Sequence, residues 1–566
     1  MDKKNPPNRR LAMYVGLVLL TVVVYGHGIT RSQGEFIDAP HHLLNGIFVL
    51  DALTDFGNAI SDPRAFAINY YQHFPAVNIG YYPPVFPICE AMVMAVVGVS
   101  GPAGQLTVLL FAVIATLFAF AWFRLRVDDL WALCATALLM YAPYLVYWGR
   151  DIMLEIPVLA LSLASMYWFE LLLRADRPTW RDSLLWATCT ILAMWTKQHA
   201  LMLLGIFAVT TLTTRRFRHL THPSILSAIV LISISAVALV WVQVRVGGDA
   251  VGHSVGFTRQ HVADRFNWEQ WRFYLRRFDE VVYWPVLVAA GLGLINVIRE
   301  RVAFSSVILV WPVTFYFMHS YMKAQDIRYA ILAMPPVIAL AVMGVRSLGT
   351  SPPQTDELMP RTGLTAKLAM AGLLIYTGIG TLRVSVPSVS PSYRQAADEL
   401  CERIGPYSCL TFVPERAARP PVMHRLAIEP ELNGEKDIYS FGKILRAAQV
   451  LRGGVEQWPD TATISNALIE WNVKYLLIEE PSPLNERTEE FVIQPWLDEI
   501  AAREFRLVAE YPIDLTAPRW PVRISRNDHP LRALKLFERV APMEFNPQAD
   551  PPIKPRRVPI TISGST

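Results

Sequence analysis

Long apolar runs alternate with short polar connections over most of the chain. Runs close to the ~20 residues that an α-helix needs to cross a bilayer recur from Leu11 to about Arg383 and then stop. We expect spanning helices at about 11–30, 104–123, 130–148, 153–173, 183–196, 199–213, 224–246, 282–298, 303–320, 328–346 and 365–383. The pattern therefore predicts a polytopic α-helical membrane protein with about eleven transmembrane helices, followed by a soluble tail.

One further apolar run, VFPICEAMVMAVVGVSG at 85–101, is shorter than a usual span. The placement of Lys and Arg decides how to interpret it, because short cytoplasmic connections carry an excess of both. If 85–101 does not cross, the basic N-terminus shares one side with the basic connections RLRVDD, RADRPTWR, TTRRFRH and RERV. We therefore predict an interfacial or re-entrant outer helix at 85–101, a cytoplasmic N-terminus and a multi-pass protein of the plasma (inner) membrane.

The first apolar run has no good A-x-A cleavage site, so we interpret it as an anchor rather than a signal peptide. In this topology the outer face carries the long loop 31–103, the loop 247–281 and the turn 319–328. The start of the fourth span, at Arg150 to Glu155, and the turn at Lys197 also face outward.

The tail, 384–566, changes character. It opens with a Pro/Ser linker, and PSYRQAADELCERIG then predicts a helix. CLTFVP, VKYLLIEE and FRLVAEYPI predict strands, so we expect a small extracytoplasmic α/β domain with a Pro-rich end, after a transmembrane domain at 1–383. Cys401 and Cys409 both fall in this domain, where a disulfide between them is a candidate.

Composition supports the membrane prediction and excludes several functions. The chain is 53% hydrophobic with a mean hydropathy of +0.29, and only 18% of its residues are charged, against roughly 25% in soluble proteins. It contains no P-loop, no full dinucleotide fingerprint and no zinc-finger spacing. The net charge of +4 is small, and we expect no nucleic acid partner. An active site would therefore face outward and take substrates from the membrane.

The first outer loop carries candidate chemistry. Asp38 follows the first span, with His42 nearby in DAPHH, and a carboxylate there could take a proton from a hydroxyl. A solvated loop carboxylate is the alternative. Tyr81 and Tyr82 precede a Pro-Pro break, where they suit either an aromatic belt or stacking against a sugar.

Cations gather at the outer ends of several spans, against the usual bias. They are Arg150, Lys197, Lys323 and Arg328. Binding of an anion is one explanation, and ion pairs with Asp151, Glu155 or Asp326 are the other. The aromatic and basic loop 256–278 predicts an interfacial helix lying on the headgroups.

In this order and on this side of the membrane, these motifs resemble those of the GT-C glycosyltransferases. Within this group they look like the motifs of the protein O-mannosyltransferase-like family 39 and of the bacterial aminoarabinose transferase-like family 83. The motifs are the first Asp, the aromatic–Pro break, R-x-x-x-x-E, TK and RY…PP, and they cover about residues 10–385. The resemblance implies a GT-C fold and transfer of a hexosyl or pentosyl group from a polyprenyl-phosphate donor. The acceptor would be a protein, lipid or cell-envelope glycan outside the cytoplasm.

The resemblance also assigns roles by position. Asp38 matches the catalytic carboxylate and Glu155 the second one, while Lys197 matches the lysine of TK. Tyr329 matches the aromatic residue of the late turn, and His261 loosely matches a histidine of the amphipathic loop.

One position departs from the family pattern. Many relatives have Glu after the first Asp, where this chain has Ala39. Either the neighbouring His42 compensates, or the metal and acceptor preferences differ from those of the relatives.

The implied chemistry is an inverting transfer. Asp38 would deprotonate the acceptor hydroxyl, and Arg150, Lys197 and Arg328 would stabilise the departing phosphate. No cofactor is certain; a divalent metal ion at Asp38 and Glu155 is an option that would need further ligands.

Other functions stay open on the sequence alone. A secondary transporter would place ionisable groups near the midplane of two related halves, whereas these charges cluster at one face and no internal repeat is visible. A lipid-linked glycan polymerase or ligase with the same fold is not separated from the transferase by any motif. A non-catalytic scaffold would not need the outward cations or the matched carboxylate.

Overall fold

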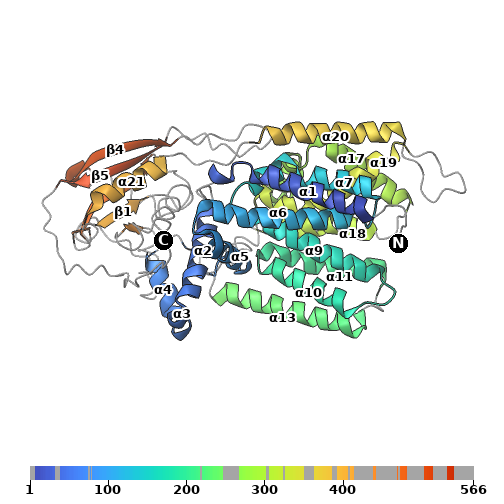
Figure 1. The fold of residues 1–566 in the computed structure, drawn as a ribbon, viewed down its shortest axis with the longest axis horizontal. Helices are drawn as coiled ribbons and strands as arrows, with labels where there is room; N and C mark the ends of the chain where they lie inside the picture. Colours follow the sequence, from blue (N-terminus) through green and yellow to red (C-terminus); the bar gives the residue numbers. More distant parts are fainter. Residues whose placement is uncertain are drawn as a thin grey trace, which may run out of the picture.

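The chain folds into a bundle of helices with a small β-sheet beside one end of it (Figure 1). The computed structural model describes residues 7–31, 38–73, 77, 80–216, 220–245, 267–300, 305–322, 325–349, 363–384, 392–405, 408–412, 438–440, 468–469, 472–480, 502–513 and 532–540. We call the end of the bundle where α1 begins the N-terminal end, and the opposite end, next to the sheet, the sheet end.

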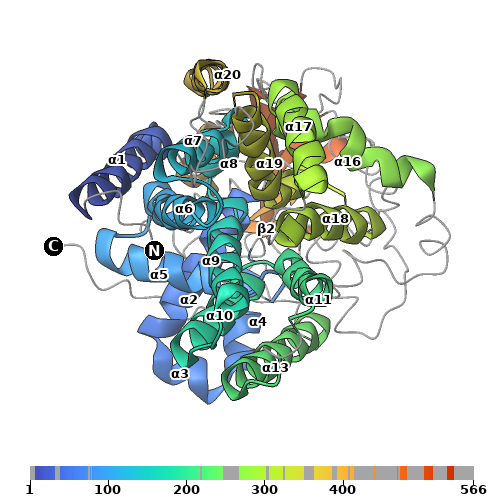
Figure 2. The ribbon, with the colours of Figure 1, turned by 90° about the vertical axis from the view of Figure 1, so that its right-hand side faces the viewer.

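The bundle helices follow the predicted apolar runs closely. They are α1 (Pro7–Gly26), α6 (Gly101–Phe123), α7 (Asp129–Met140), α8 (Pro143–Gly149), α9 (Glu155–Arg174), α10 (Trp180–Met194), α11 (Met202–Thr214), α13 (Pro223–Arg245), α17 (Trp284–Glu300), α18 (Ser305–Tyr321), α19 (Met334–Ser347) and α20 (Leu364–Leu382). Viewed from the N-terminal end, α9 lies inside the bundle, while α1, α13 and α20 lie at its periphery (Figure 2).

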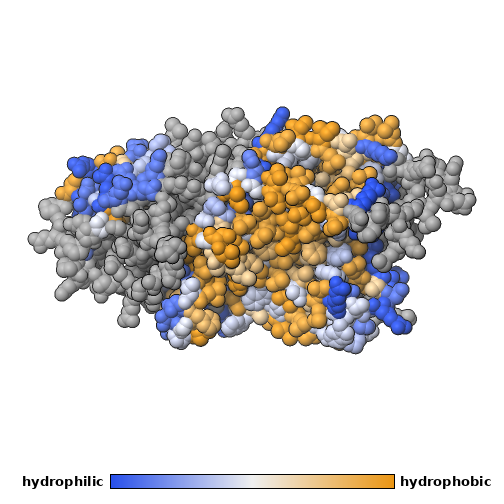
Figure 3. Space-filling view, viewed as in Figure 1, coloured by the Kyte–Doolittle hydropathy of each residue, from blue (hydrophilic) through white to orange (hydrophobic). Residues whose placement is uncertain are grey.

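Six helices among the described residues are long and apolar enough to cross a membrane, or up to eight if each bent pair forms one span. In one bent pair, α7 and α8 meet at 59° where Pro143 begins the second helix. The eleven crossings stay a prediction, since helices such as α10, with 15 residues, are short for a full span. Apolar side chains cover the bundle face seen in Figure 3, as a bilayer requires.

The outer helices α2 (Ala39–Thr54), α3 (Phe56–Ser61), α4 (Pro63–His73) and α5 (Val85–Val97) lie at the sheet end. The apolar run at 85–101 contains α5, a helix of 13 residues that is too short to span and packs against α2 and α6. The amphipathic segment contains α16 (Trp268–Val281), which meets α17 at 112°. Such an angle suits a helix that lies across the bundle rather than along it.

The C-terminal region contains α21 (Ser392–Ile404) and five described strands in the order β2-β1-β3-β5-β4. β1 (Ser408–Phe412) pairs in parallel with β2 (Ile438–Ser440) and β3 (Val473–Glu480), whereas β5 (Arg532–Arg539) pairs antiparallel with β3 and β4 (Phe505–Ile513). The predicted helix and three strands are present. β2 and β5 had not been predicted.

The cysteine prediction remains untested. Cys409 is buried in β1, but the side chain of Cys401 lies outside the described residues. The division at residue 383 into two domains likewise stays a prediction.

Two groups of ion pairs close the N-terminal end of the bundle. Asp129 accepts hydrogen bonds from Arg10 at 3.1 Å and from Arg124 at 2.6 Å. Glu170 is fully buried and pairs with Arg126 and Arg174. These contacts join α1, α6, α7 and α9, so charge in this layer has a structural use.

Candidate active site

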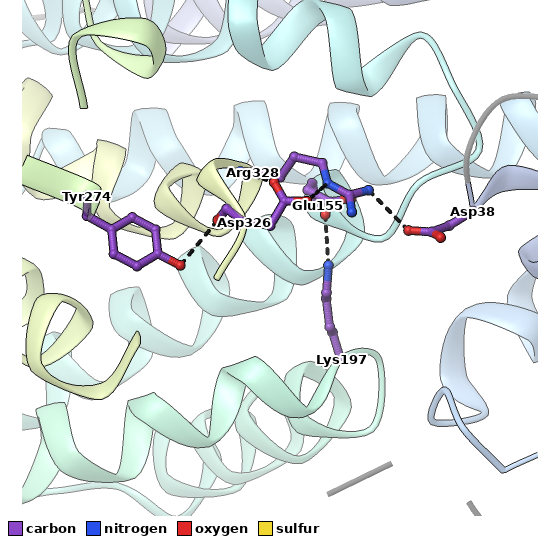
Figure 4. Close-up of polar contacts among 6 residues, drawn as sticks. All are labelled: Asp38, Glu155, Lys197, Tyr274, Asp326 and Arg328. Carbon is purple, nitrogen blue, oxygen red and sulfur yellow. Dashed lines mark hydrogen bonds and ion pairs between the residues drawn. The ribbon is translucent and has the colours of Figure 1, made fainter. Parts of the chain in front are cut away.

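At the sheet end, one arginine joins two carboxylates from distant segments (Figure 4). Arg328 donates from Nη1 to Asp38 Oδ2 at 3.1 Å and from Nε to Asp326 Oδ2 at 2.8 Å. Its guanidinium also lies over the ring of Trp148, 5.0 Å from the centroid. The Arg328 side chain is only 12% exposed, whereas the two carboxylates are about one third exposed, so the opening lies on the carboxylate side.

A second ion pair lies beside the first. Lys197 Nζ donates to Glu155 Oε1 at 2.8 Å, and the two side chains are 10% and 3% exposed. Lys197 also lies over the ring of Tyr329, 5.1 Å from its centroid. The charges of Arg328 and Asp38 act on Glu155 as well, so the two ion pairs form one electrostatic cluster.

Local structure explains why these side chains converge. Asp326 caps the 3-10 helix η3 (Ile327–Ala333) by accepting from Arg328 N at 2.9 Å, and Tyr274 of α16 donates to its backbone oxygen at 3.2 Å. Glu155 begins α9, and Lys197 lies in the turn between α10 and the 3-10 helix η2 (Gln198–Leu201). The cluster thus depends on helix ends, where short turns fix the side chains in place.

Burial and charge set the protonation states of the groups at the mouth of the cluster. Burial raises the pKa of Asp38, but the charge and hydrogen bond of Arg328, together with the nearby imidazoles of His42 and His41, hold the pKa below its ordinary value, so Asp38 is ionised at neutral pH. Burial lowers the pKa of His42 to about 3, and that ring is neutral. Burial raises the pKa of Asp151 to about 7, next to the charges of Asp38 and Glu155.

Most of the predicted site residues come together. Asp38, Glu155, Lys197, Arg328 and Tyr329 belong to the cluster described above. The ring of His42 lies 4.5 Å from that of Tyr82, which in turn packs against Tyr81 at 4.9 Å. Burial raises the pKa of Tyr82 well above its ordinary value, and the nearby Asp38 adds to this effect. His261 and Lys323 lie outside the described residues, so their roles stay predictions.

Arg150 contacts two backbone carbonyls, and its role in phosphate binding stays a prediction. Its Nε donates to the Val24 oxygen at 3.0 Å and its Nη1 to the Val384 oxygen at 2.8 Å. These carbonyls lie at the ends of α1 and α20, where backbone oxygens lack a partner within the helix. Arg150 therefore ties two helix ends together, and the structure does not place it with the phosphate-binding candidates.

Two buried histidines had not been predicted. The centroid of the His199 ring lies 4.1 Å from that of Tyr329 and 5.5 Å from that of His319. The planes of the two histidine rings are nearly parallel. Neither ring nitrogen of His199, nor Nε2 of His319, has a hydrogen-bond partner among the described residues. The only sequence signal was the position of His199 two residues after Lys197. Buried polar atoms of this kind commonly bind water or a ligand.

A metal ion does not fit the described part of the cluster. No group of three or more His, Cys, Asp or Glu side chains there could hold one. The two carboxylates suggested as ligands are instead paired with cations, Asp38 with Arg328 and Glu155 with Lys197.

Comparison with known proteins identifies the fold. Residues 82–241 match the family model described as dolichyl-phosphate-mannose-protein mannosyltransferase. A search of curated proteins by sequence finds no significant match.

Solved structures are similar over almost the whole chain. ArnT from Cupriavidus metallidurans bound to undecaprenyl phosphate has 11% identity and a TM-score of 0.58, covering 92% of this chain and 97% of ArnT. Its apo structure has 12% identity and a TM-score of 0.56 with the same coverage. The mycobacterial arabinofuranosyltransferase AftD has 13% identity and a TM-score of 0.50, covering 94% of this chain and 40% of AftD. The chain therefore has the GT-C fold that its motifs led us to expect.

Proposed function

We propose that this protein is an integral-membrane glycosyltransferase that moves a sugar from a polyprenyl-phosphate donor to a hydroxyl acceptor. The observation that carries the proposal is the cluster of two ion pairs, Asp38–Arg328 and Glu155–Lys197, at one end of a GT-C fold. The match of residues 82–241 to a family acting with dolichyl-phosphate mannose agrees with it. So does the undecaprenyl phosphate bound to ArnT.

Asp38 is the proposed base. The acceptor oxygen would give its proton to the Asp38 carboxylate and form a bond with the anomeric carbon. The bond from that carbon to the phosphate oxygen would break, and the electron pair would leave with the polyprenyl phosphate. Attack from the face opposite the phosphate inverts the anomeric centre.

Arg328 would couple donor binding to the strength of this base. In the structure its positive charge holds the pKa of Asp38 low, which makes the carboxylate a weak proton acceptor. A donor phosphate bound by Arg328 would partly neutralise that charge, and the pKa of Asp38 would rise toward the range of an effective base. Asp38 would then act chiefly when donor is present.

Lys197 completes the proposed phosphate site. It is largely buried, and in surroundings of low polarity its charge would stabilise the departing phosphate more strongly than it would in water. Glu155 holds Lys197 in place through the 2.8 Å contact. His42, being neutral, would orient the acceptor or Asp38 rather than supply charge.

The sidedness follows the predicted topology. With the N-terminus in the cytoplasm, the sheet end would face outward, and the 384–566 region would lie near the acceptor. In this proposal the acceptor is a protein, a lipid or a cell-envelope glycan on that side of the membrane, and the sugar is a hexose or a pentose.

The test is sugar transfer by membranes containing wild type, Asp38→Asn or Asp62→Asn, with a panel of radiolabelled polyprenyl-phosphate sugars. Asp62 is an exposed carboxylate between α3 and α4 and serves as the matched control. We expect one donor to be used by wild type and by Asp62→Asn, with a loss of about 10²–10⁴-fold in Asp38→Asn.

The other outcomes would contradict the proposal at different points. Transfer that persists in Asp38→Asn would remove Asp38 as the base. A product that keeps the donor's anomeric configuration would exclude direct inversion. Failure of wild type with every donor would count against the activity itself.

A further inference from the structure

The bundle contains an apolar cavity far from the ion-pair cluster. It has a volume of about 420 Å³ and lies between α9, α10, α11 and α13. Phe169, Trp186 and Phe207 form part of its wall, with ring centroids 4.4 to 5.5 Å apart. Ala208 of α11 and Ser233 of α13 line it as well.

The lining favours a hydrocarbon chain over water. A space of this size that opens to the outside of the bundle has room for several methylene groups of a hydrocarbon chain. A buried water needs about 2–4 polar partners. The hydroxyls in the lining belong to Thr211 and Ser233, and that of Thr211 already donates to the Phe207 oxygen at 2.8 Å.

The cavity opens toward the lipid at the N-terminal end of the bundle. Ala208 is exposed and Leu212, also in the lining, is 58% exposed, so this wall meets the outside of the bundle. Phe169 lies almost four turns along α9 from Glu155, about 21 Å at 1.5 Å per residue. A chain in the cavity would therefore belong to the leaflet opposite the candidate active site.

Cationic side chains flank this opening. Arg215 follows Thr211 by about one turn at the end of α11, and Arg181 lies in the first turn of α10. Both are exposed, and neither forms an ion pair within the part of the chain that the structure describes. Asp176 and Asp182 lower the local charge, but the connections 174–181 and 213–216 remain basic together. A basic rim beside an apolar cleft is the usual requirement for binding an anionic lipid.

We propose that this cavity binds an anionic glycerophospholipid, with an acyl chain against Phe169, Trp186 and Phe207 and the headgroup phosphate beside Arg181 and Arg215. Three of the four surrounding helices, α9, α10 and α11, reach the Glu155–Lys197 region at their other ends. A lipid here would thus hold together the helices that position that ion pair. The inference does not depend on the proposed transferase activity.

The experiment is native mass spectrometry of the full chain in detergent, with added dioleoylphosphatidylglycerol or dioleoylphosphatidylcholine. One variant, Ala208→Leu/Ser233→Leu, fills the cavity with apolar side chains; its control, Val237→Leu, changes an exposed site on α13 that does not line it. The rim variant is Arg181→Gln/Arg215→Asn, and its control is Arg299→Gln, an exposed arginine of α17.

We expect wild type to retain phosphatidylglycerol in preference to phosphatidylcholine. The cavity variant should lower this retention about tenfold, because an apolar segment of the lipid can no longer be buried. The rim variant should lower it by a similar factor, because a charge-assisted contact is lost, and both controls should retain the lipid as wild type does. Equal retention of the two lipids, or equal losses in a variant and its control, would overturn the proposal. If wild type retains added undecaprenyl phosphate but not phosphatidylglycerol, and the cavity variant loses it, the proposal is overturned and the cavity binds the polyprenyl lipid instead. Melting temperatures near wild type would show that the variants are folded.

Discussion

Both ends of the bundle hold buried or partly buried ion pairs, but the pairs are built in opposite ways. At the N-terminal end each carboxylate contacts two arginines: Asp129 joins Arg10 to Arg124, and Glu170 joins Arg126 to Arg174. At the sheet end one arginine, Arg328, joins two carboxylates, and Lys197 holds a third. The first arrangement leaves its carboxylates fully engaged, as a structural network requires.

The sheet end leaves polar atoms without partners. Glu155 Oε2, Asp151 Oδ2, His42 Nδ1 and both nitrogens of His199 are buried with no hydrogen-bond partner among the described residues. At the N-terminal end, the charged groups of the described chain leave only Arg126 Nε in this state. Unsatisfied buried groups cost stability, so their concentration around one cluster is expected where a ligand completes the contacts. Charge therefore stabilises the fold at one end and, in our proposal, serves chemistry at the other.

Removing both charges of one ion pair at the sheet end should have a large effect on transfer and a small effect on stability. We expect Glu155→Gln/Lys197→Met to lower transfer about 10²–10³-fold, because a phosphate-stabilising cation is lost. Stability should change by only about 1 kcal/mol, since no buried charge remains unpaired within this pair. Transfer rates and thermal unfolding in the same detergent measure the two effects. A double variant that unfolds, or one that transfers sugar normally, would show that this pair is structural after all.

The matched change at the N-terminal end should have the reverse outcome. Glu170→Gln leaves Arg126, whose side chain is 6% exposed, without its carboxylate. We expect a loss of about 3 kcal/mol in stability, because an unpaired buried charge is costly. Transfer per folded molecule should stay near wild type, and Glu170→Gln/Arg126→Met should recover part of the stability. A specific loss of transfer in fully folded Glu170→Gln would show that charge at the N-terminal end also serves catalysis.

The helices could be predicted from the sequence because their signal is local. An apolar run predicted a span at 153–173, and α9 occupies Glu155–Arg174. The same reasoning separated 85–101 from the spans, because its length and the placement of Lys and Arg are also local properties. β5 was missed, since its charged sequence RALKLFER resembles a helix or loop until β3 and β4 pair with it.

The site was only partly predictable because its contacts are distant in sequence. Motif order indicated Asp38 and Arg328, but their contact joins residues 290 positions apart. The contacts of Arg150 could not be predicted because a sequence does not show which way a guanidinium points, and its partners are backbone carbonyls 126 and 234 positions away. No pattern of charged residues in the sequence indicated His199. It is a candidate site residue only because the structure buries it beside Tyr329 and His319.

A further carboxylate near the sheet end, Asp51 of α2, differs from both groups because it has no cationic partner among the residues that the structure describes. Its Oδ2 accepts from Tyr70 at 2.9 Å, and burial raises its pKa to about 6 from an ordinary 3.8. The folded protein then binds more protons than the unfolded chain between about pH 4 and pH 6, so stability falls as the pH rises through this range.

From pH 4.5 to pH 7 this amounts to about 2 kcal/mol, and we expect Asp51→Asn to remove it while leaving the rest of the pH profile unchanged. Thermal unfolding of wild type, Asp51→Asn and the exposed control Asp62→Asn at both pH values measures the effect. If Asp51→Asn keeps the full pH dependence, an unseen cation must hold Asp51 ionised. The sheet end would then resemble the N-terminal end more closely than these contacts indicate, because carboxylates there would also be paired for stability.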